Sequence, residues 1–222
     1  MIVVLGNSHV VSFVGSPPCG TKIPGRINQR NVQHNVDHPE IMAVFLGRGL
    51  VAYNFKENHL PKILQVIAER NLSKANDTLL LHIGEVDCRY FLAKRILEGG
   101  DQDVVVNECV DRFFETVKCL VADGWKVALV GAHPSTTEGH SEHPDKPHFG
   151  DCAFRNSVCM TWNAALETKC VAMKLPFVSI FKHLVDLNNI TDMSYFVDYC
   201  HLSYDKCFPL YLAEMRAVGL MP

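Results

Sequence analysis

Apolar residues along the chain form two kinds of pattern: short, nearly continuous runs, and longer stretches in which they recur every three or four positions. A short apolar run is typical of a strand buried on both faces of a parallel sheet, and the wider spacing is typical of an amphipathic helix. The runs predict strands over Ile2–Leu5, Ile41–Leu46, Thr78–Ile83, Lys126–Val130 and Phe177–Ile180. The wider spacing predicts helices over His59–Asn71, Tyr90–Leu97, Asp103–Asp123, Phe154–Met173 and Tyr204–Ala217.

The alternation of these strands and helices determines the expected fold class. Strands separated by helices predict a right-handed, doubly wound α/β sheet with helices on both faces. Ligand sites in such folds lie at the carboxyl ends of the strands. Two long irregular segments, residues 15–39 and 132–151, follow the first and fourth predicted strands and would emerge at that edge. Loops of this length in a compact domain are usually functional or mobile.

Composition and charge narrow the class of protein. The chain has 222 residues, of which 48% are apolar and 20% charged, and this suits one α/β domain, or at most two small ones, with a sizeable core. Its net charge of −3 argues against a nucleic-acid-binding protein and against polybasic attachment to a membrane. We expect no transmembrane helix, because no apolar stretch is long enough, and no signal peptide, because the N-terminus lacks a basic region.

The nine cysteines indicate the kind of cellular compartment in which the protein is expected. They include no Cys-x-x-Cys pair, which excludes zinc-ribbon and thioredoxin motifs, and an odd number cannot all pair within one chain. Several lie in apolar runs, where a free cysteine behaves as a small apolar residue. We therefore expect a reducing, cytoplasmic location in which most thiols are buried and unpaired.

Polar residues follow the first and third predicted strands. The motif Gly6–His9 (Gly-Asn-Ser-His) allows a tight turn with an exposed serine hydroxyl, although the same four residues also describe an ordinary polar turn. The motif Gly84–Arg89 (Gly-Glu-Val-Asp-Cys-Arg) carries three charged side chains. They form either a solvated loop with a surface ion pair or a polar cluster at the edge of a site.

A third polar motif, Asp198–His201, precedes the last predicted helix. An aspartate three residues ahead of a histidine can hold one ring nitrogen in a turn, which leaves the other nitrogen to accept a proton from a serine. The alternative is that the two residues only cap the helix that follows.

In this order and at these positions, the three motifs resemble those of the SGNH (GDSL-type) hydrolase superfamily, over essentially the whole chain. The most similar branch is the one whose third-strand motif reads Gly-Glu-x-Asp-Cys-Arg. Phe149–Asp151, Arg155 and Trp162–Leu166 also resemble that branch. The resemblance implies a three-layer α/β/α sandwich of flavodoxin-like type, with a five-stranded parallel sheet in one domain over residues 1–222.

The resemblance also implies a role for each matching residue. Ser8 matches the nucleophile, His201 the general base and Asp198 the residue that orients the base. The backbone N–H of Ser8 matches one donor of the oxyanion hole. Gly47 matches the second donor, with Gly49 as the alternative.

The third oxyanion donor departs from the superfamily pattern. Its usual asparagine is replaced by Val86, which cannot donate, and loss of one such donor commonly lowers the rate by about 10²–10³. Arg89 is the candidate replacement, because a guanidinium offers several donors, and Asp87 could orient it. The residues assigned to the substrate-binding edge of the site are His9, Glu85, Asp87 and Arg155.

The second irregular segment is rich in histidine. His140 and His143 lie three residues apart with carboxylates nearby, but no helix fixes their geometry and their spacing is not that of a structural zinc site. We therefore expect this segment to be a polar lid, and we expect neither a metal ion nor a cofactor.

These expectations favour a serine esterase that acts through an acyl-enzyme on a small-molecule or glycan ester, with removal of O-acetyl groups from a carbohydrate as the narrower interpretation. One alternative is an acyltransferase that passes the acyl group to a sugar hydroxyl at the same site. The other is a non-catalytic carbohydrate-binding or scaffold module, which Val86 at the donor position favours. The oligomeric state stays open.

Overall fold

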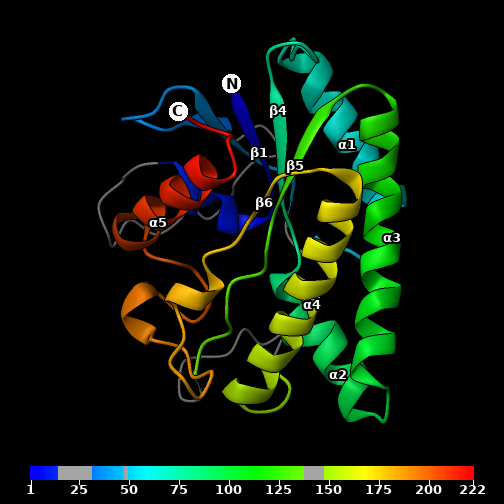
Figure 1. The fold of residues 1–222 in the computed structure, drawn as a ribbon, viewed down its shortest axis with the longest axis vertical. Helices are drawn as coiled ribbons and strands as arrows, with labels where there is room; N and C mark the ends of the chain where they lie inside the picture. Colours follow the sequence, from blue (N-terminus) through cyan, green and yellow to red (C-terminus); the bar gives the residue numbers. More distant parts are fainter. Residues whose placement is uncertain (15–31, 48–49, 138–147) are drawn as a thin grey trace.

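The computed structural model of the chain describes residues 1–14, 32–47, 50–137 and 148–222 (Figure 1). Its centre is a six-stranded sheet in the order β2-β3-β1-β4-β5-β6. Every neighbouring pair is parallel except β2 and β3, which are antiparallel. The strands are β1 (Ile2–Gly6), β2 (Val32–His34), β3 (Ile41–Phe45), β4 (Thr78–His82), β5 (Lys126–Val130) and β6 (Phe177–Val178).

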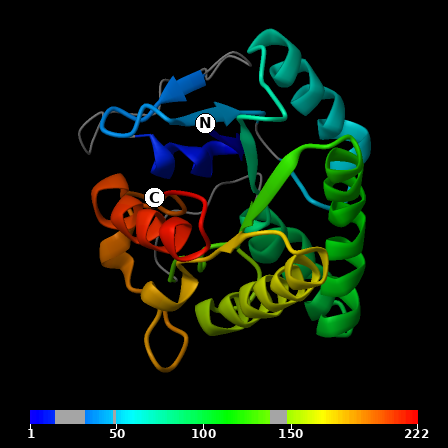
Figure 2. The ribbon, with the colours of Figure 1, turned by 45° about the horizontal axis from the view of Figure 1, so that its top comes forward.

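Helices cover both faces of the sheet, as Figures 1 and 2 show. The α-helices are α1 (Phe55–Glu69), α2 (Ala93–Leu97), α3 (Gln102–Ala122), α4 (Cys152–Met173) and α5 (Tyr204–Ala217). The short segments are the 3-10 turns η1 (Ser8–Phe13), η3 (Phe181–His183) and η4 (Met193–Tyr195), and the π-helical turn η2 (Asp87–Leu92). The predicted three-layer α/β/α sandwich is confirmed. No helix within the described residues is long and apolar enough to cross a membrane.

Alternate residues of the central strands supply two separate cores. In β1, Val3 and Leu5 belong to the core beneath α1, α3 and α4, whereas Ile2 and Val4 belong to the core beneath α5 and η1. Because successive side chains of a strand point to opposite faces, a strand buried on both faces must be apolar throughout. This explains why the sequence of β1 is a continuous apolar run.

The predicted strand count was wrong by one. Val32–His34 forms an antiparallel edge strand in a segment that we expected to be irregular. Its three residues include the exposed Gln33 and His34, so there is neither an apolar run nor a clear alternation to detect. The strand depends instead on a turn in which Asn35 Oδ1 accepts hydrogen bonds from the backbone N–H groups of Asp37 and His38, both at 2.9 Å.

Element boundaries differ from the predictions in two further places. The first long helix begins at Phe55, four residues before the predicted start, and continues through Pro61. The helix predicted from Tyr90 begins as the π-helical turn at Asp87 and becomes α-helical at Ala93. The other predicted helices are observed within about two residues of their predicted ends.

The parallel register brings the candidate residues to one edge of the sheet. Gly6 at the end of β1 pairs with His82 at the end of β4, and His82 pairs with Val130 at the end of β5. The segments that follow, residues 7–9, 83–89 and 131–137, therefore emerge side by side at the carboxyl edge, where sites of this fold class lie.

Candidate functional site

A sharp turn after β1 presents Ser8. A Cβ atom at Gly6 would lie 2.4 Å from the carbonyl oxygen of His82, so only glycine fits at this point of the sheet. Asn7 then caps η1, because its side chain accepts a hydrogen bond from the backbone N–H of His9 at 3.1 Å. Ser8 is the first residue of η1 and is partly exposed.

The turn before α5 holds an aspartate–histidine pair. Asp198 Oδ1 accepts hydrogen bonds from the backbone N–H groups of Cys200 (2.9 Å) and His201 (2.7 Å). Its other oxygen, Oδ2, lies 2.7 Å from His201 Nδ1. Burial opposes the charged form of Asp198, but the hydrogen bonds from His201 and the backbone lower the pKa of its carboxyl to about 2. An ionised Asp198 requires a proton on Nδ1, which leaves Nε2 of the ring as the proton acceptor.

The aspartate–histidine pair lies beside the segment that carries Ser8. The ring of His9, the residue after Ser8, is 5.2 Å from the ring of His201 between centroids. Among the contacts of the described residues, no hydrogen bond joins Ser8 to His201. The fold thus brings the two predicted catalytic segments together at one edge, although they come from opposite ends of the sequence.

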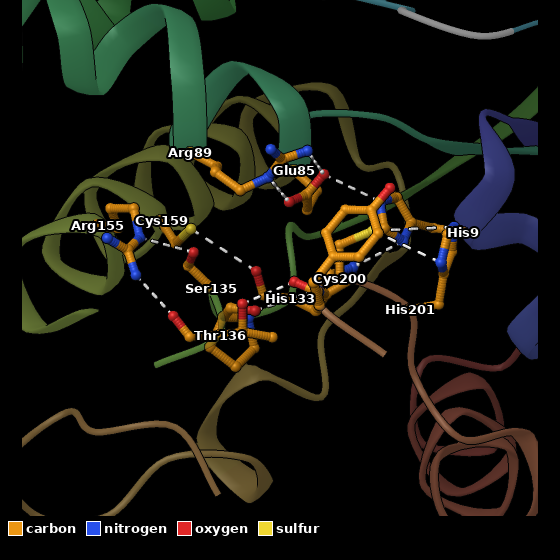
Figure 3. A network of polar contacts seen from close by, with 12 residues as sticks. His9, Glu85, Arg89, His133, Ser135, Thr136, Arg155, Cys159, Cys200 and His201 are labelled. Carbon is orange, nitrogen blue, oxygen red and sulfur yellow. Dashed lines mark hydrogen bonds and ion pairs between the residues drawn. The ribbon is translucent and has the colours of Figure 1, made fainter. Parts of the chain in front are cut away.

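A buried ion-pair network adjoins this region (Figure 3). Glu85 Oε1 accepts a hydrogen bond from Arg89 Nε at 2.5 Å, and Glu85 Oε2 lies 2.9 Å from His9 Nε2. All three side chains are about 5% exposed or less. Burial opposes ionisation of Glu85, yet Arg89 and His9 hold the pKa of its carboxyl well below the usual value. Glu85 therefore carries a negative charge that faces two basic side chains.

Two further histidines, which the sequence analysis did not assign to the site, belong to the same cluster. His133 Nε2 lies 3.0 Å from His9 Nδ1, and burial lowers the pKa of His133 to about 3. The ring of His82, at the end of β4, lies near both rings, with its centroid 6.2 Å from that of His9 and 6.3 Å from that of His133. Only their positions in the sequence could have indicated them. His82 is the last residue of β4, which neighbours β1, and His133 follows the end of β5, which neighbours β4.

The predicted site-edge residue Asp87 is completely buried. Its two carboxylate oxygens accept hydrogen bonds from the backbone N–H of Ala52, at 2.9 and 3.1 Å. Asp87 thereby fixes the segment between β3 and α1. Arg89 forms an ion pair with Glu85, and the role of Asp87 in orienting Arg89 stays a prediction.

Gly47, the expected second oxyanion donor, lies two residues beyond β3 and has a φ of +139°, which favours glycine. Since Gly6 pairs with Phe45, Ser8 and Gly47 stand equally far beyond adjacent strand ends. The backbone N–H of Leu46 donates to the carbonyl of Gly6 at 2.8 Å and continues the strand pairing to this point. The alternative donor, Gly49, lies outside the described residues.

Arg155 lies behind the edge of the site and is 1% exposed. It donates hydrogen bonds to Ser135 Oγ at 2.8 Å, to the carbonyl of Thr136 at 2.6 Å and to the carbonyl of Gly150. These contacts make Arg155 an anchor of the segment after β5. Its assignment to the substrate-binding edge of the site stays a prediction.

The thiols and the candidate metal ligands need no ion to account for them. No disulfide bond joins any two of the eight described cysteines, and seven of these cysteines are buried. Asp198, Cys200 and His201 bring donor atoms within 4.8 Å of one another, a grouping that the Asp198–His201 hydrogen bond explains. Burial raises the pKa of the Cys200 thiol, which disfavours the thiolate that a metal requires. His140 and His143 lie outside the described residues.

Comparison with known proteins identifies the fold. Neither a protein-family model nor a curated protein matches the sequence. Solved structures with a similar fold include a carbohydrate acetylesterase of Sinorhizobium meliloti (TM-score 0.57, 12% identity, covering 99% of each chain) and an aryl esterase of M. smegmatis (TM-score 0.56, 13% identity, 99% of each chain). A GDSL-like lipase of Bacteroides thetaiotaomicron is also similar (TM-score 0.56, 16% identity, 97% of this chain and 88% of the other). The chain therefore has the same α/β/α fold as these two esterases and this lipase.

Proposed function

We propose that this protein is a serine ester hydrolase, with Ser8 as nucleophile, His201 as general base and Asp198 as the residue that orients the base. The observation that carries the proposal is the Asp198–His201 pair at 2.7 Å, next to the turn that presents Ser8. Similarity in fold to esterases and lipases supports the same class of reaction.

In the proposed mechanism, His201 Nε2 takes the proton of the Ser8 hydroxyl as the Ser8 oxygen attacks the ester carbonyl carbon. The ionised Asp198 stabilises the imidazolium that forms. His201 then protonates the leaving alcohol, and an acyl-Ser8 ester remains. A water molecule that gives its proton to His201 attacks this ester, and the acid leaves as Ser8 regains its proton.

The oxyanion that forms in each step requires hydrogen-bond donors. We assign this role to the backbone N–H groups of Ser8 and Gly47, which stand beyond neighbouring strand ends. Arg89 supplies positive charge nearby, and Glu85 fixes its guanidinium. Preorganised donors of this kind commonly contribute roughly 3–4 kcal/mol each to transition-state stabilisation.

For the substrate we propose an O-acetyl ester on a carbohydrate. Two proteins of similar fold are described as a carbohydrate acetylesterase and, from Geobacillus, an acetyl-xylooligosaccharide esterase (TM-score 0.54, 15% identity). The second candidate is a non-catalytic carbohydrate-binding module of the same fold. It is favoured by Val86, which is buried and cannot replace the missing donor.

The two candidates differ in turnover. Release of p-nitrophenol from p-nitrophenyl acetate, and of acetate from an acetylated xylo-oligosaccharide, should be measured for the wild type, for Ser8→Ala and for the control Ser73→Ala, which changes a serine in the turn before β4. We expect Ser8→Ala to lose at least about 10³-fold in kcat while the control keeps the wild-type rate. Equal turnover in Ser8→Ala and the wild type would remove Ser8 from the mechanism. Binding of the oligosaccharide without any acetate release would favour the binding module.

A further inference from the structure

The segment that follows β5 touches both halves of the proposed catalytic machinery. We call residues 131–137 the β5 loop. On one side, His133 Nε2 lies 3.0 Å from a ring nitrogen of His9, the neighbour of Ser8. On the other side, Thr136 Oγ1 donates a hydrogen bond of 2.7 Å to the carbonyl of Tyr199, which stands between Asp198 and His201.

Side chains of α4 hold the β5 loop in place. Asn163 bonds to both backbone groups of Ala132, accepting from its N–H at 2.7 Å and donating to its carbonyl at 2.9 Å. About two α-helical turns nearer the start of α4, Asn156 Oδ1 accepts a hydrogen bond from the backbone N–H of Ser135 at 2.8 Å. Arg155 binds the same part of the loop, as Figure 3 shows.

These contacts are almost completely shielded from water. His133, Thr136, Arg155 and Asn156 are each 1% exposed or less. Hydrogen bonds in so dry an environment are strengthened, and leaving one partner unbonded is costly. The β5 loop is therefore a rigid connection rather than an adaptable surface loop.

We propose that the β5 loop sets the separation between Ser8 and His201, with His133 and Thr136 as positioning residues at its two ends. The effect of the loop on catalysis rests on the proposed function, but its effect on the separation between Ser8 and His201 does not. The competing explanation is that packing of α5 against η1 sets this separation, through contacts such as that between Phe13 and Tyr211, whose rings are 4.3 Å apart.

Removal of one hydroxyl distinguishes these explanations. Thr136→Val deletes the hydrogen bond to Tyr199 and leaves the packing of α5 unchanged, and Thr136→Ser keeps the hydroxyl. The matched control is Thr168→Val, which deletes a hydrogen bond of 2.8 Å to the carbonyl of Ala164 on the exposed side of α4.

The first measurement is hydrogen exchange at the backbone amides of Cys200 and His201, which donate to Asp198. We expect exchange in Thr136→Val to accelerate by roughly 3- to 10-fold, the range that corresponds to the net contribution of one hydrogen bond to stability. Thr136→Ser and Thr168→Val should exchange at the wild-type rate. This measurement requires no catalytic activity, so it also tests the effect of the loop on this separation in a protein that hydrolyses no ester.

The second measurement is the kinetics of p-nitrophenyl acetate hydrolysis. Misplacement of a reacting group by about 1 Å can cost on the order of 10²-fold in rate. We expect kcat of Thr136→Val to fall at least about 10-fold with KM within about twofold of the wild type, and Thr136→Ser to restore kcat. A variant that is only less stable would keep its kcat per folded molecule.

Wild-type exchange rates and kcat in Thr136→Val would overturn the proposal and assign the separation to α5 packing. If Thr136→Val does not fold, the other end of the loop provides the test. His133→Phe keeps a ring but loses the contact with His9, and we expect faster exchange at the His9 amide, which donates to Asn7. An unchanged His9 amide in that variant would equally overturn the proposal. A wild type without esterase activity would refute the proposed function alone.

Discussion

At the residue scale, the candidate site depends on charges that are buried yet compensated. Arg89 and Glu85 are each about 4% exposed, and Glu85 also contacts His9. A buried ion pair adds little stability when compared with apolar residues, but loss of one partner leaves an uncompensated charge in a medium of low dielectric constant. The pair therefore fixes geometry more than it stabilises the fold.

The substitution Glu85→Gln tests this description. It preserves the shape of the side chain but removes the anion that pairs with the buried guanidinium of Arg89, so we expect the free energy of unfolding to fall by about 3–5 kcal/mol. The control is Glu98→Gln, which removes the acid of the exposed pair with Lys94 (3.8 Å) and should cost no more than about 1 kcal/mol. Urea denaturation of both variants at pH 7 gives the comparison. Equal losses would mean that water reaches the Glu85–Arg89 pair.

The sequence could predict the contacts that are local and not those that depend on sheet order. Asp198 and His201 are three residues apart, so a single turn brings them together, and the motif alone indicates it. The contact between His9 and His133 joins residues 124 positions apart. This contact requires that only β4 lies between β1 and β5 in the sheet and that the segments after β1 and β5 meet across the end of β4. No local sequence pattern encodes this arrangement.

At the element scale, Gly84 determines how closely α4 approaches the end of β4. It has a φ of +121°, and a Cβ atom there would lie 2.5 Å from Nε1 of Trp162 on α4. Gly99 is a matched comparison, because its φ is +104° but nothing lies within 4 Å of its Cβ position.

We expect Gly84→Ala to be clearly more destabilising than Gly99→Ala. Both variants carry the cost of an unfavourable backbone conformation, about 1–3 kcal/mol. Only Gly84→Ala adds the overpacking cost of roughly 1–3 kcal/mol against Trp162. The difference between their unfolding free energies therefore isolates the contact, and a difference near zero would show that α4 can shift away without cost. Chemical denaturation of the two variants measures it.

Elements with a clear hydrophobic period could be predicted, and elements stabilised by other contacts could not. Helix α3 was predicted to within a residue, because its buried positions recur every three or four residues over 21 residues. The edge strand β2 has three residues, two of them exposed, and depends on the Asn35 turn and on pairing with the edge of β3. The π-helical turn η2 has six residues, of which four are buried, and shows no helical period from which it could be predicted.

At the scale of the whole molecule, the buried histidines make the fold sensitive to acid. Burial lowers the pKa of His59 to about 4 and of His133 to about 3, and it lowers the pKa of His82 well below 6.5. In the unfolded chain each imidazole returns to a pKa of about 6.5. The unfolded state therefore binds more protons than the folded state at mildly acidic pH, and stability must fall as the pH falls from about 6.5 towards 4.

The size of this effect follows from the number of protons. At pH 5 unfolding takes up close to one proton at each of these three histidines, and each proton contributes about 1.4 kcal/mol per pH unit to the slope of stability against pH. We expect a combined slope of roughly 4 kcal/mol per pH unit between pH 6 and 5. The carboxyl of Asp198, whose pKa is about 2, acts in the same direction at lower pH, because its charged form is favoured in the folded state.

One histidine can be separated from the others without disturbing the candidate site. His59 lies on α1, 7% exposed, with its ring packed 5.1 Å from that of Phe55. We expect His59→Leu to reduce the slope of stability against pH by about 1.4 kcal/mol per pH unit between pH 6 and 5, because one proton no longer binds on unfolding.

At pH 8 the imidazole is neutral in both states, so the effect of the substitution there reports packing alone and serves as the internal control. Urea denaturation of the wild type and the variant at pH 5, 6 and 8 measures both quantities. If the two proteins lose stability in parallel as the pH falls, His59 is protonated in the folded state, and the acid sensitivity must arise from the histidines at the carboxyl edge of the sheet.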